Sequence, residues 1–425
     1  MSSFTQNPRC SCALGGALAA VSNLHRTIPI LHAGPGCGPQ VTMGQTLVAG
    51  LNGPGYVGGN AVPSTNMYER EVVFGGEGRL RELIDTSFQV MDGDLYFVLS
   101  GCTSDIIGDD VKGIVDGYRR KGHAIAWAET AGFKGNSFHG YERVFEALLD
   151  QWITPAERAP RAVNLFGVVP HQDIYWQGNL EEITRLLRRL GLEVNAFFLE
   201  KQGIGAIQRS SGASLNLFLS PWLGEGIAAR YEERFGVPAL RLPGLPVGPT
   251  ATAELLRRVG AATGVEERVI EAVVADETEY YYRYIERISD LFVRFRVAVI
   301  GDSGAATGIT RFLVNDLGQT PKVVAITDEP REERHAAIVG ALERLEFGEP
   351  PVVVFSQETD VIKRAVLESG ANYVLGSSLD LEFAKEHDLN FQFTSFPVTD
   401  RLVLNKACAG IRGSLTLVED FFSPI

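Results

Sequence analysis

Short apolar runs alternate along the chain with amphipathic stretches of helical period. Runs that are apolar at consecutive positions are typical of strands buried on both faces of a parallel sheet, and amphipathic stretches between them are typical of helices that cover such a sheet. The alternation therefore predicts an α/β fold. The predicted strands span residues 27–31, 95–99, 124–128, 162–169, 193–198, 215–219, 238–242, 296–302, 323–327, 352–355 and 373–376.

The predicted helices lie between these strands, and two segments break the pattern. Residues 41–63 are rich in Gly, Asn and Pro and are expected to form an irregular loop. Residues 151–161, where Pro155 and charged side chains interrupt the alternation, are interpreted as a seam between units. The predicted helices span residues 13–22, 77–88, 105–120, 180–190, 224–235, 265–291, 303–317 and 413–422.

A chain of 425 residues is too long for one ordinary core. We expect three Rossmann-like units with mostly parallel sheets flanked by helices. They are an N-terminal α/β domain over residues 1–155 with the candidate cysteines described below, a middle α/β domain over residues 156–290 and a C-terminal α/β domain over residues 291–425. The long predicted helix at residues 265–291 would bridge the second unit and the third.

The balance of charged residues limits the kinds of molecule that the chain is expected to bind. The chain has 39 Lys and Arg residues against 52 Asp and Glu residues, a formal net charge of −13. An acidic surface disfavours nucleic acid or an anionic membrane as the main partner. The first residues lack the pattern of a signal peptide, and no apolar stretch is long enough to span a bilayer. A cytoplasmic location is the resulting expectation, and the five cysteines are not expected to form structural disulfides.

Three cysteines in glycine-rich surroundings are candidate metal ligands. Cys12 is followed by ALGG, Cys37 lies in GPGCGP, and Cys102 lies in SGCTSD after the predicted strand at residues 95–99. Glycine lets the backbone approach a bulky group closely, and thiolates bind soft metals and iron–sulfur clusters. Each cysteine alone is more simply a small buried hydrophobic residue, but the three together favour a ligand set. Since three ligands are an incomplete shell for a large cluster, we expect a second chain to supply the rest.

The motifs around these cysteines resemble those of the component-one family of nitrogenases. The resemblance rests on CALG from Cys12, PILHAGPGC ending at Cys37, VFGG at residues 73–76 and CTSDIIGDD from Cys102, in this order and spacing. It is closer to the β-type subunit, because FPVTDR at residues 396–401 resembles the closing motif of that subunit. The likeness covers essentially the whole chain.

The resemblance implies a heterotetramer of two α-type and two β-type chains. In this family each αβ pair shares an 8Fe-7S P-cluster at its interface, held by three cysteines from each chain. Carried over by position, those of this chain are Cys12, Cys37 and Cys102. The resemblance also implies a homodimeric ATP-dependent iron protein as reductase, which passes low-potential electrons through the interface to a large iron–sulfur cofactor in the α-type chain. This chain would be an oxidoreductase subunit whose substrate chemistry takes place in its partner.

Two positions depart from the family's patterns. Ser220 follows the predicted strand at residues 215–219, where α-type chains have the cysteine that holds the large cofactor, so we expect no substrate-reducing cofactor in this chain. Gly132 stands where β-type chains have a serine that can ligate the oxidised P-cluster. Together with the short length of the chain, these departures make the chain resemble the methylthio-alkane reductases most. Those are nitrogenase-like enzymes that cleave carbon–sulfur bonds.

Three other functions stay open. The chain could be the β subunit of a dinitrogen-reducing nitrogenase. It could also belong to a scaffold for cofactor maturation, although β-like chains of that kind typically keep fewer of the three cysteines. The third alternative is a non-redox α/β binding protein with incidental cysteines.

The remaining candidate residues near the cysteines have structural interpretations beside functional ones. Cys10 is interpreted as a bystander rather than a spare ligand, and Cys408 as a packing residue. His32 could hydrogen-bond a cluster sulfide or be satisfied by the backbone. Ser104, with Thr103, is expected to cap the helix after Cys102.

Two further segments are expected to carry no chemistry of their own. Asp109 and Asp110 are interpreted as a solvated pair of helix carboxylates or a contact for the partner chain. The segment at residues 301–308 follows a strand and opens a helix, but it lacks both the GxGxxG spacing and a Walker lysine. We therefore expect it to be a plain strand-to-helix turn.

Overall fold

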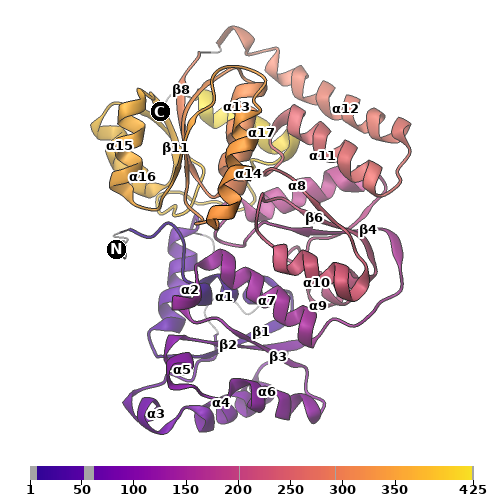
Figure 1. Ribbon diagram of the computed structural model, residues 1–425, viewed down its shortest axis with the longest axis vertical. Coiled ribbons are helices and arrows are strands. Elements are labelled where there is room, and N and C mark those ends of the chain that lie inside the picture. The colour runs from indigo at the N-terminus through magenta and orange to yellow at the C-terminus, as the bar shows by residue number, and fades with distance from the viewer. Residues whose placement is uncertain (1–6, 52–61, 201, 292, 424–425) are drawn as a thin grey trace.

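The computed structural model describes residues 7–51, 62–200, 202–291 and 293–423. Within this part of the chain the strands form three sheets, with three, four and five strands (Figure 1). Every strand pairing is parallel, which confirms the predicted α/β class. Among the described residues, no helix combines the length and the apolar character needed to cross a membrane.

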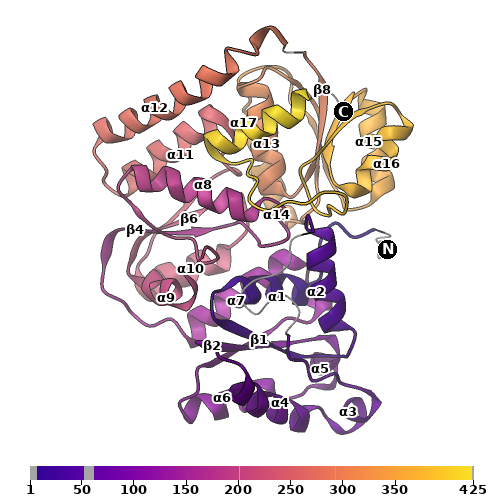
Figure 2. The same cartoon turned by 180° about the vertical axis from the view of Figure 1, so that it is seen from behind.

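The first sheet has the order β1-β2-β3 and is covered on both faces. Its strands are β1 (Thr27–His32), β2 (Leu95–Ser100) and β3 (Ile125–Glu129). Figures 1 and 2 show α4 (Glu77–Val90) and α6 (Val111–Arg120) on the outer face, and α1 (Ala13–Asn23) and α7 (Ser137–Gln151) on the face toward the rest of the molecule. All residues of β1 and β2 are buried, as their uninterrupted apolar runs predict.

The second and third sheets follow in chain order, with strand orders β5-β4-β6-β7 and β10-β9-β8-β11-β12. The second sheet comprises β4 (Ala159–Phe166), β5 (Glu193–Asn195), β6 (Ala213–Phe218) and β7 (Ala239–Arg241). The third comprises β8 (Arg296–Gly301), β9 (Thr320–Ile326), β10 (Val352–Phe355), β11 (Tyr373–Gly376) and β12 (Asn390–Phe393). The associated helices are α8 (Trp176–Arg189), α9 (Gly203–Arg209), α10 (Glu225–Phe235), α11 (Gly248–Ala262), α12 (Glu267–Ile285), α13 (Ser303–Asn315), α14 (Glu332–Glu343), α15 (Thr359–Ser369), α16 (Ser378–Glu386) and α17 (Gly410–Phe422).

The strands expected at residues 162–169 and 193–198 are β4 and β5, which end at Phe166 and Asn195, and three other predicted segments differ more. The expected loop at residues 41–63 begins inside helix α2 (Cys37–Val48), and residues 52–61 lie outside the described part. The expected helix at residues 105–120 is two helices, α5 (Cys102–Ile107) and α6, because Gly108 adopts a left-handed conformation between them. The expected helix at residues 265–291 ends earlier, since α12 stops at Ile285.

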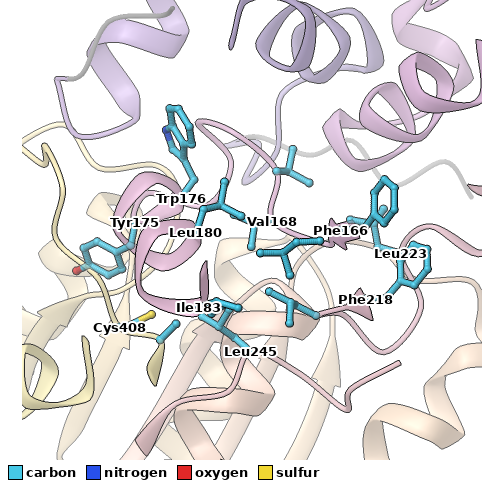
Figure 3. Close-up of a cluster of buried hydrophobic side chains, with 14 of the residues drawn as sticks. Phe166, Val168, Tyr175, Trp176, Leu180, Ile183, Phe218, Leu223, Leu245 and Cys408 are labelled. Atoms are coloured by element: carbon cyan, nitrogen blue, oxygen red, sulfur yellow. The ribbon is translucent and has the colours of Figure 1, made fainter. Parts of the chain in front are cut away.

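A continuous hydrophobic core joins all three sheets. Helix α17, at the end of the chain, packs against α8, α11 and α12 rather than only against the sheet that precedes it. Figure 3 shows Cys408 among Tyr175, Leu180 and other apolar side chains of this core, where it is 2% exposed. Burial raises the pKa of Cys408 well above its usual value. Cys408 is therefore a packing residue, as expected, while the domain boundaries after residues 155 and 290 stay a prediction.

Candidate functional site

The three candidate cysteines line one cavity of about 660 Å³, which we call the thiol cavity. Cys12 is exposed, and Cys37 and Cys102 are half-buried, so the thiols are reachable from outside the chain. Each stands at the start of a helix: Cys12 directly precedes α1, Cys37 opens α2 and Cys102 opens α5.

The parallel sheet explains why residues distant in sequence meet here. His32 at the end of β1 pairs with Ser100 at the end of β2, which in turn pairs with Glu129 at the end of β3. Because the carboxyl ends of parallel strands lie at one edge, the turns after them converge. Cys37 and Cys102 lie in the turns after β1 and β2, on the wall of the cavity.

Gly132, in the turn after β3, lies against two of the thiols. Its backbone N–H donates a hydrogen bond to Cys102 Sγ at 3.1 Å. A Cβ atom at this position would lie 3.3 Å from Cys102 Sγ and 3.6 Å from Cys12 Sγ. Burial raises the pKa of Cys37, and negative charge on Cys102 and Cys12 raises it further. Three thiolates this close repel one another unless a cation lies between them.

The geometry distinguishes between a single ion and a larger group. Among the described residues, no group of three or more His, Cys, Asp or Glu side chains is arranged to hold one metal ion. A closed zinc site needs four ligands around one ion, whereas an iron–sulfur cluster has several irons and can be held along a wall. The all-thiol donor set, the bare glycine beside it and the size of the cavity fit an iron–sulfur cluster.

Close helix packing fixes Cys12 in this wall. Helices α1 and α7 touch through Gly16 and Gly140: a Cβ at Gly16 would lie 2.0 Å from the carbonyl oxygen of Ser137, and one at Gly140 would lie 1.9 Å from that of Ala13. Only glycine permits this approach. The backbone of Ser137 also donates to the Ser11 carbonyl at 2.8 Å. The start of α1 is therefore held against the start of α7.

Arg9 anchors the same segment to the third sheet and was not anticipated from the sequence. Its Nη1 and Nη2 donate to Asp380 at 2.8 and 2.7 Å, and the two side chains are 1% and 0% exposed. The Arg9 N–H donates to Gln357 Oε1 at 3.1 Å, and Gln172 Nε2 donates to the Arg9 carbonyl at 3.0 Å. The only sequence signal would have been a charged residue close to a candidate ligand.

His32 and Asp109 differ from their predicted roles. The ring nitrogens of His32 lie 3.2 Å from Thr65 Oγ1 and 2.9 Å from Asp109 Oδ2, so side chains rather than the backbone or the cavity satisfy them. Asp109 is not solvated: its side chain is 4% exposed and also accepts from the Gly76 N–H at 3.1 Å. Burial lowers the pKa of His32, although Asp109 opposes this shift. Asp110, by contrast, is exposed and caps α6 through the Gly113 N–H.

Two residues close to the candidate cysteines have structural partners. Cys10 lines the thiol cavity, but its Sγ lies 3.4 Å from the Thr327 carbonyl oxygen, to which it donates. Burial raises the pKa of Cys10 well above its usual value, which disfavours the thiolate. Ser104 accepts from the Gly101 N–H at 3.1 Å and donates to the His32 carbonyl at 2.7 Å. It caps α5 and ties it to β1.

Two other turns considered in the sequence, at Ser220 after β6 and at Asp302 after β8, are filled by the protein's own atoms. Ser220 Oγ accepts from the Leu223 N–H at 3.2 Å, and the space beside Leu219 and Asp302 is about 10 Å³. At the start of α13, Asp302 accepts from the N–H groups of Gly304 and Ala305, both at 3.0 Å, so a carboxylate already occupies this helix N-terminus. Burial raises the pKa of Asp302 to about 6. This is the expected plain turn, and the absence of a substrate-reducing cofactor from this chain stays a prediction.

Helix α2, on the rim of the thiol cavity, reverses the usual pattern of burial. It buries Thr42 and Gln45, and Gln45 Nε2 donates to the Gly15 carbonyl at 2.8 Å. Its apolar residues Met43 and Leu47 are 57% and 48% exposed. Phe133, which also lines the cavity, is 61% exposed. Apolar groups gathered around an open site are typical of a surface that another chain covers.

Three parallel sheets joined in one core, with a thiol-lined cavity at an edge of the first, define a multi-unit α/β protein with a candidate iron–sulfur site. The chain belongs to the family of nitrogenase component 1 type oxidoreductases, whose family profile matches residues 12–425. The solved structure of nitrogenase Cp1 at pH 6.5 has the same fold, with a TM-score of 0.84 at 18% identity over 99% of this chain and 93% of that chain.

Two curated relatives that match nearly the whole chain are β chains of nitrogenases. The molybdenum–iron protein beta chain of Methanococcus maripaludis is 24% identical over 99% of this chain and 94% of its own length. The vanadium–iron protein beta chain of Trichormus variabilis is 23% identical over 96% and 91%. An iron–molybdenum cofactor biosynthesis protein of Methanococcus maripaludis is 25% identical, but over only 61% of this chain and 52% of its own.

Proposed function

We propose that this chain is the β-type subunit of a nitrogenase-like reductase, and that Cys12, Cys37 and Cys102 hold its half of an interfacial iron–sulfur cluster of the P-cluster type. The observation that carries the proposal is that these thiols, from three separate segments, line one cavity open to the surface. When bound, the cluster supplies one-electron storage and transfer between an ATP-dependent iron protein and a cofactor in the α-type partner.

The protein's own residues hold and tune the ligands. The Gly132 N–H donates a hydrogen bond to Cys102 Sγ. A hydrogen bond to a ligand sulfur withdraws negative charge from it and so raises the reduction potential of the group it binds. Arg9 and the contact of α1 with α7 keep Cys12 in place. None of these residues transfers a proton to substrate.

The partner we propose is an α-type chain that covers the thiol cavity and supplies the remaining ligands. Phe133 lines the cavity and is exposed, Met43 and Leu47 are exposed on helix α2, and the thiol of Cys12 is exposed as well. An exposed thiolate site of this kind would be oxidised in a free chain. Two such pairs would form the heterotetramer implied by the full-length β-chain relatives.

For the substrate we propose a methylthio-alkane. Reductive cleavage adds two electrons and two protons to a carbon–sulfur bond, which becomes one C–H bond and one S–H bond in the partner's pocket. The departure at Gly132 supports an enzyme distinct from dinitrogen-reducing nitrogenases. A maturation scaffold is the less favoured alternative, because β-like chains of that kind typically keep fewer of the three cysteines and all three are present here.

The test is to purify the complex without oxygen from its native host and to assay it with its iron protein and ATP. We expect iron and sulfide beyond the content of the partner's cofactor, and ATP-dependent release of methanethiol and methane from dimethyl sulfide. Reduction of dinitrogen instead would identify a nitrogenase, and acetylene serves as a general probe of turnover. A complex with cluster iron but no turnover on any substrate would support the scaffold, and a metal-free chain that is stable alone would support the binding protein.

Gly132→Ser is expected to add an oxygen ligand to the cluster when it is oxidised. A Cβ fits here only if neighbouring atoms move by a few tenths of an ångström, and the hydroxyl would then lie beside Cys102 and Cys12. An anionic oxygen ligand stabilises oxidised iron, so the midpoint potential should fall and become pH-dependent. Potentiometric titration of the complex measures both effects.

Gly132→Ala is the matched control, since it adds the same Cβ without a hydroxyl. It should leave the midpoint potential independent of pH. Equal behaviour of the serine and alanine variants would show that crowding alone, and not a new ligand, changes the potential.

A further inference from the structure

A second cavity, of about 520 Å³, lies between the middle sheet and helices of the C-terminal part, and arginines dominate its lining. We call it the arginine cavity. Arg241 ends β7, Arg258 is on α11, Arg311 is on α13, and Arg344 directly follows α14. Among the described lining residues, Glu254 is the only acidic one. This surplus of positive charge is notable in a chain whose net charge is −13.

Arg241 is a largely buried cation without an acidic partner. Its Nη1 donates to the carbonyl oxygens of Ser220 and Leu223 at 2.8 and 2.7 Å, and its guanidinium lies 4.8 Å from the centre of the Phe218 ring. No carboxylate in the described part of the chain forms an ion pair with it. Burial lowers the pKa of Arg241, but a guanidinium remains charged in proteins. The negative charges of Glu225 and Glu142 offset part of the cost of burying this cation, and an anion in direct contact with it would offset more.

Glu254 holds two of the other guanidinium groups in fixed positions. Its Oε1 accepts from Arg258 at 3.1 Å, and its Oε2 accepts from Arg311 at 2.9 Å. Burial would raise the pKa of Glu254, but these two arginines lower it below its usual value. One carboxylate cannot neutralise both, and Arg344 has no ion-pair partner within the described residues. The cavity is therefore preorganised and still positively charged.

We propose that the arginine cavity binds a small multivalent oxyanion that carries phosphate or carboxylate groups. The planar guanidinium fork matches both groups with paired hydrogen bonds. Pro221 and Leu242 lie just beyond the carboxyl ends of β6 and β7, where α/β proteins characteristically bind ligands, and they offer apolar contact for a carbon skeleton. The cavity volume is within the usual range of small-molecule sites.

This proposal is independent of the iron–sulfur site, because the arginine cavity shares no lining residue with the thiol cavity. The test is isothermal titration calorimetry of the purified complex, without ATP or iron protein, against inorganic pyrophosphate and against tricarballylate. We expect saturable binding of at least one probe, weakened by added salt. The probe that binds more tightly distinguishes a phosphate ligand from a polycarboxylate.

Arg344→Gln and Arg311→Gln should each weaken binding about tenfold, because each removes a charge-assisted hydrogen-bond donor. Arg344 is exposed and unpaired, so its replacement tests the site without disturbing the fold. The control is Arg257→Gln, next to Arg258 on α11 but outside the cavity and paired with Glu271 at 2.7 Å. Absence of saturable binding, equal affinity in all variants, or an equal loss in the Arg257→Gln variant would overturn the proposal.

Discussion

Replacing Cys37 by alanine is expected to remove the interfacial iron from the purified complex and to abolish ATP-dependent turnover. Cys37 opens α2 and lines the thiol cavity together with Cys12 and Cys102. Replacing a group that only orients a metal ligand already lowers metal affinity or activity by about 10–100-fold. Loss of a ligand itself should lower turnover by more than about 100-fold. Iron and sulfide analysis, with electron paramagnetic resonance of the complex, measures the loss.

The matched control for this experiment is Cys10→Ala. Cys10 lines the same cavity and also carries a thiol, but its thiol donates to the Thr327 carbonyl and its pKa is raised by burial. We expect the control to retain its iron and its turnover. If Cys37→Ala keeps full iron content, or if both variants lose iron to the same extent, then Cys37 is not a ligand.

The sheets could be predicted because buried parallel strands leave an unambiguous pattern. Residues 95–99 and 323–326 are apolar at every position, and both lie within strands covered on two faces. Helix α11 is absent from the predicted helices, and its first turn contains Gly248 and Pro249, residue types that ordinarily mark turns and loops. Proline is in fact tolerated in the first turn of a helix, where its missing N–H has no partner.

Helix α2 was missed for a different reason. Hydrophobic periodicity predicts a helix when apolar residues face the protein's own core. Here Thr42 and Gln45 face inward, and Met43 and Leu47 face outward. The exposed apolar residues of α2 therefore mark a surface that this chain does not bury. A single sequence cannot tell such a surface from an irregular loop.

The convergence of the three candidate cysteines could be predicted from the sequence, whereas the residues that hold them in place could not. Three cysteines in glycine-rich turns form a pattern visible in the sequence, and they line one cavity. The contact between His32 and Asp109 spans 77 positions, and that between Arg9 and Asp380 spans 371 positions. Such pairs depend on the final packing of separate units, which local patterns do not encode.

Arg9→Met is expected to destabilise the protein by about 3–5 kcal/mol, because it leaves Asp380 buried without its counter-charge. Both side chains are nearly inaccessible, at 1% and 0% exposure, so water cannot solvate the remaining carboxylate. Asp380 would keep only its hydrogen bonds from Ser377, at 2.8 and 2.9 Å. The midpoint of chemical unfolding of the complex should fall, and iron content should fall with it, because Arg9 anchors the segment that presents Cys12.

The double variant Arg9→Met with Asp380→Asn separates charge from packing. Asparagine keeps the size of Asp380 and can accept from Ser377, so the double variant should regain part of the lost stability. Arg257→Met, which breaks an exposed pair with Glu271, should leave the unfolding midpoint unchanged. An Arg9→Met variant as stable as the parent would show that the buried pair contributes nothing to stability. Normal stability with lost iron would instead mean that Arg9 acts only by positioning Cys12 at the edge of the cavity.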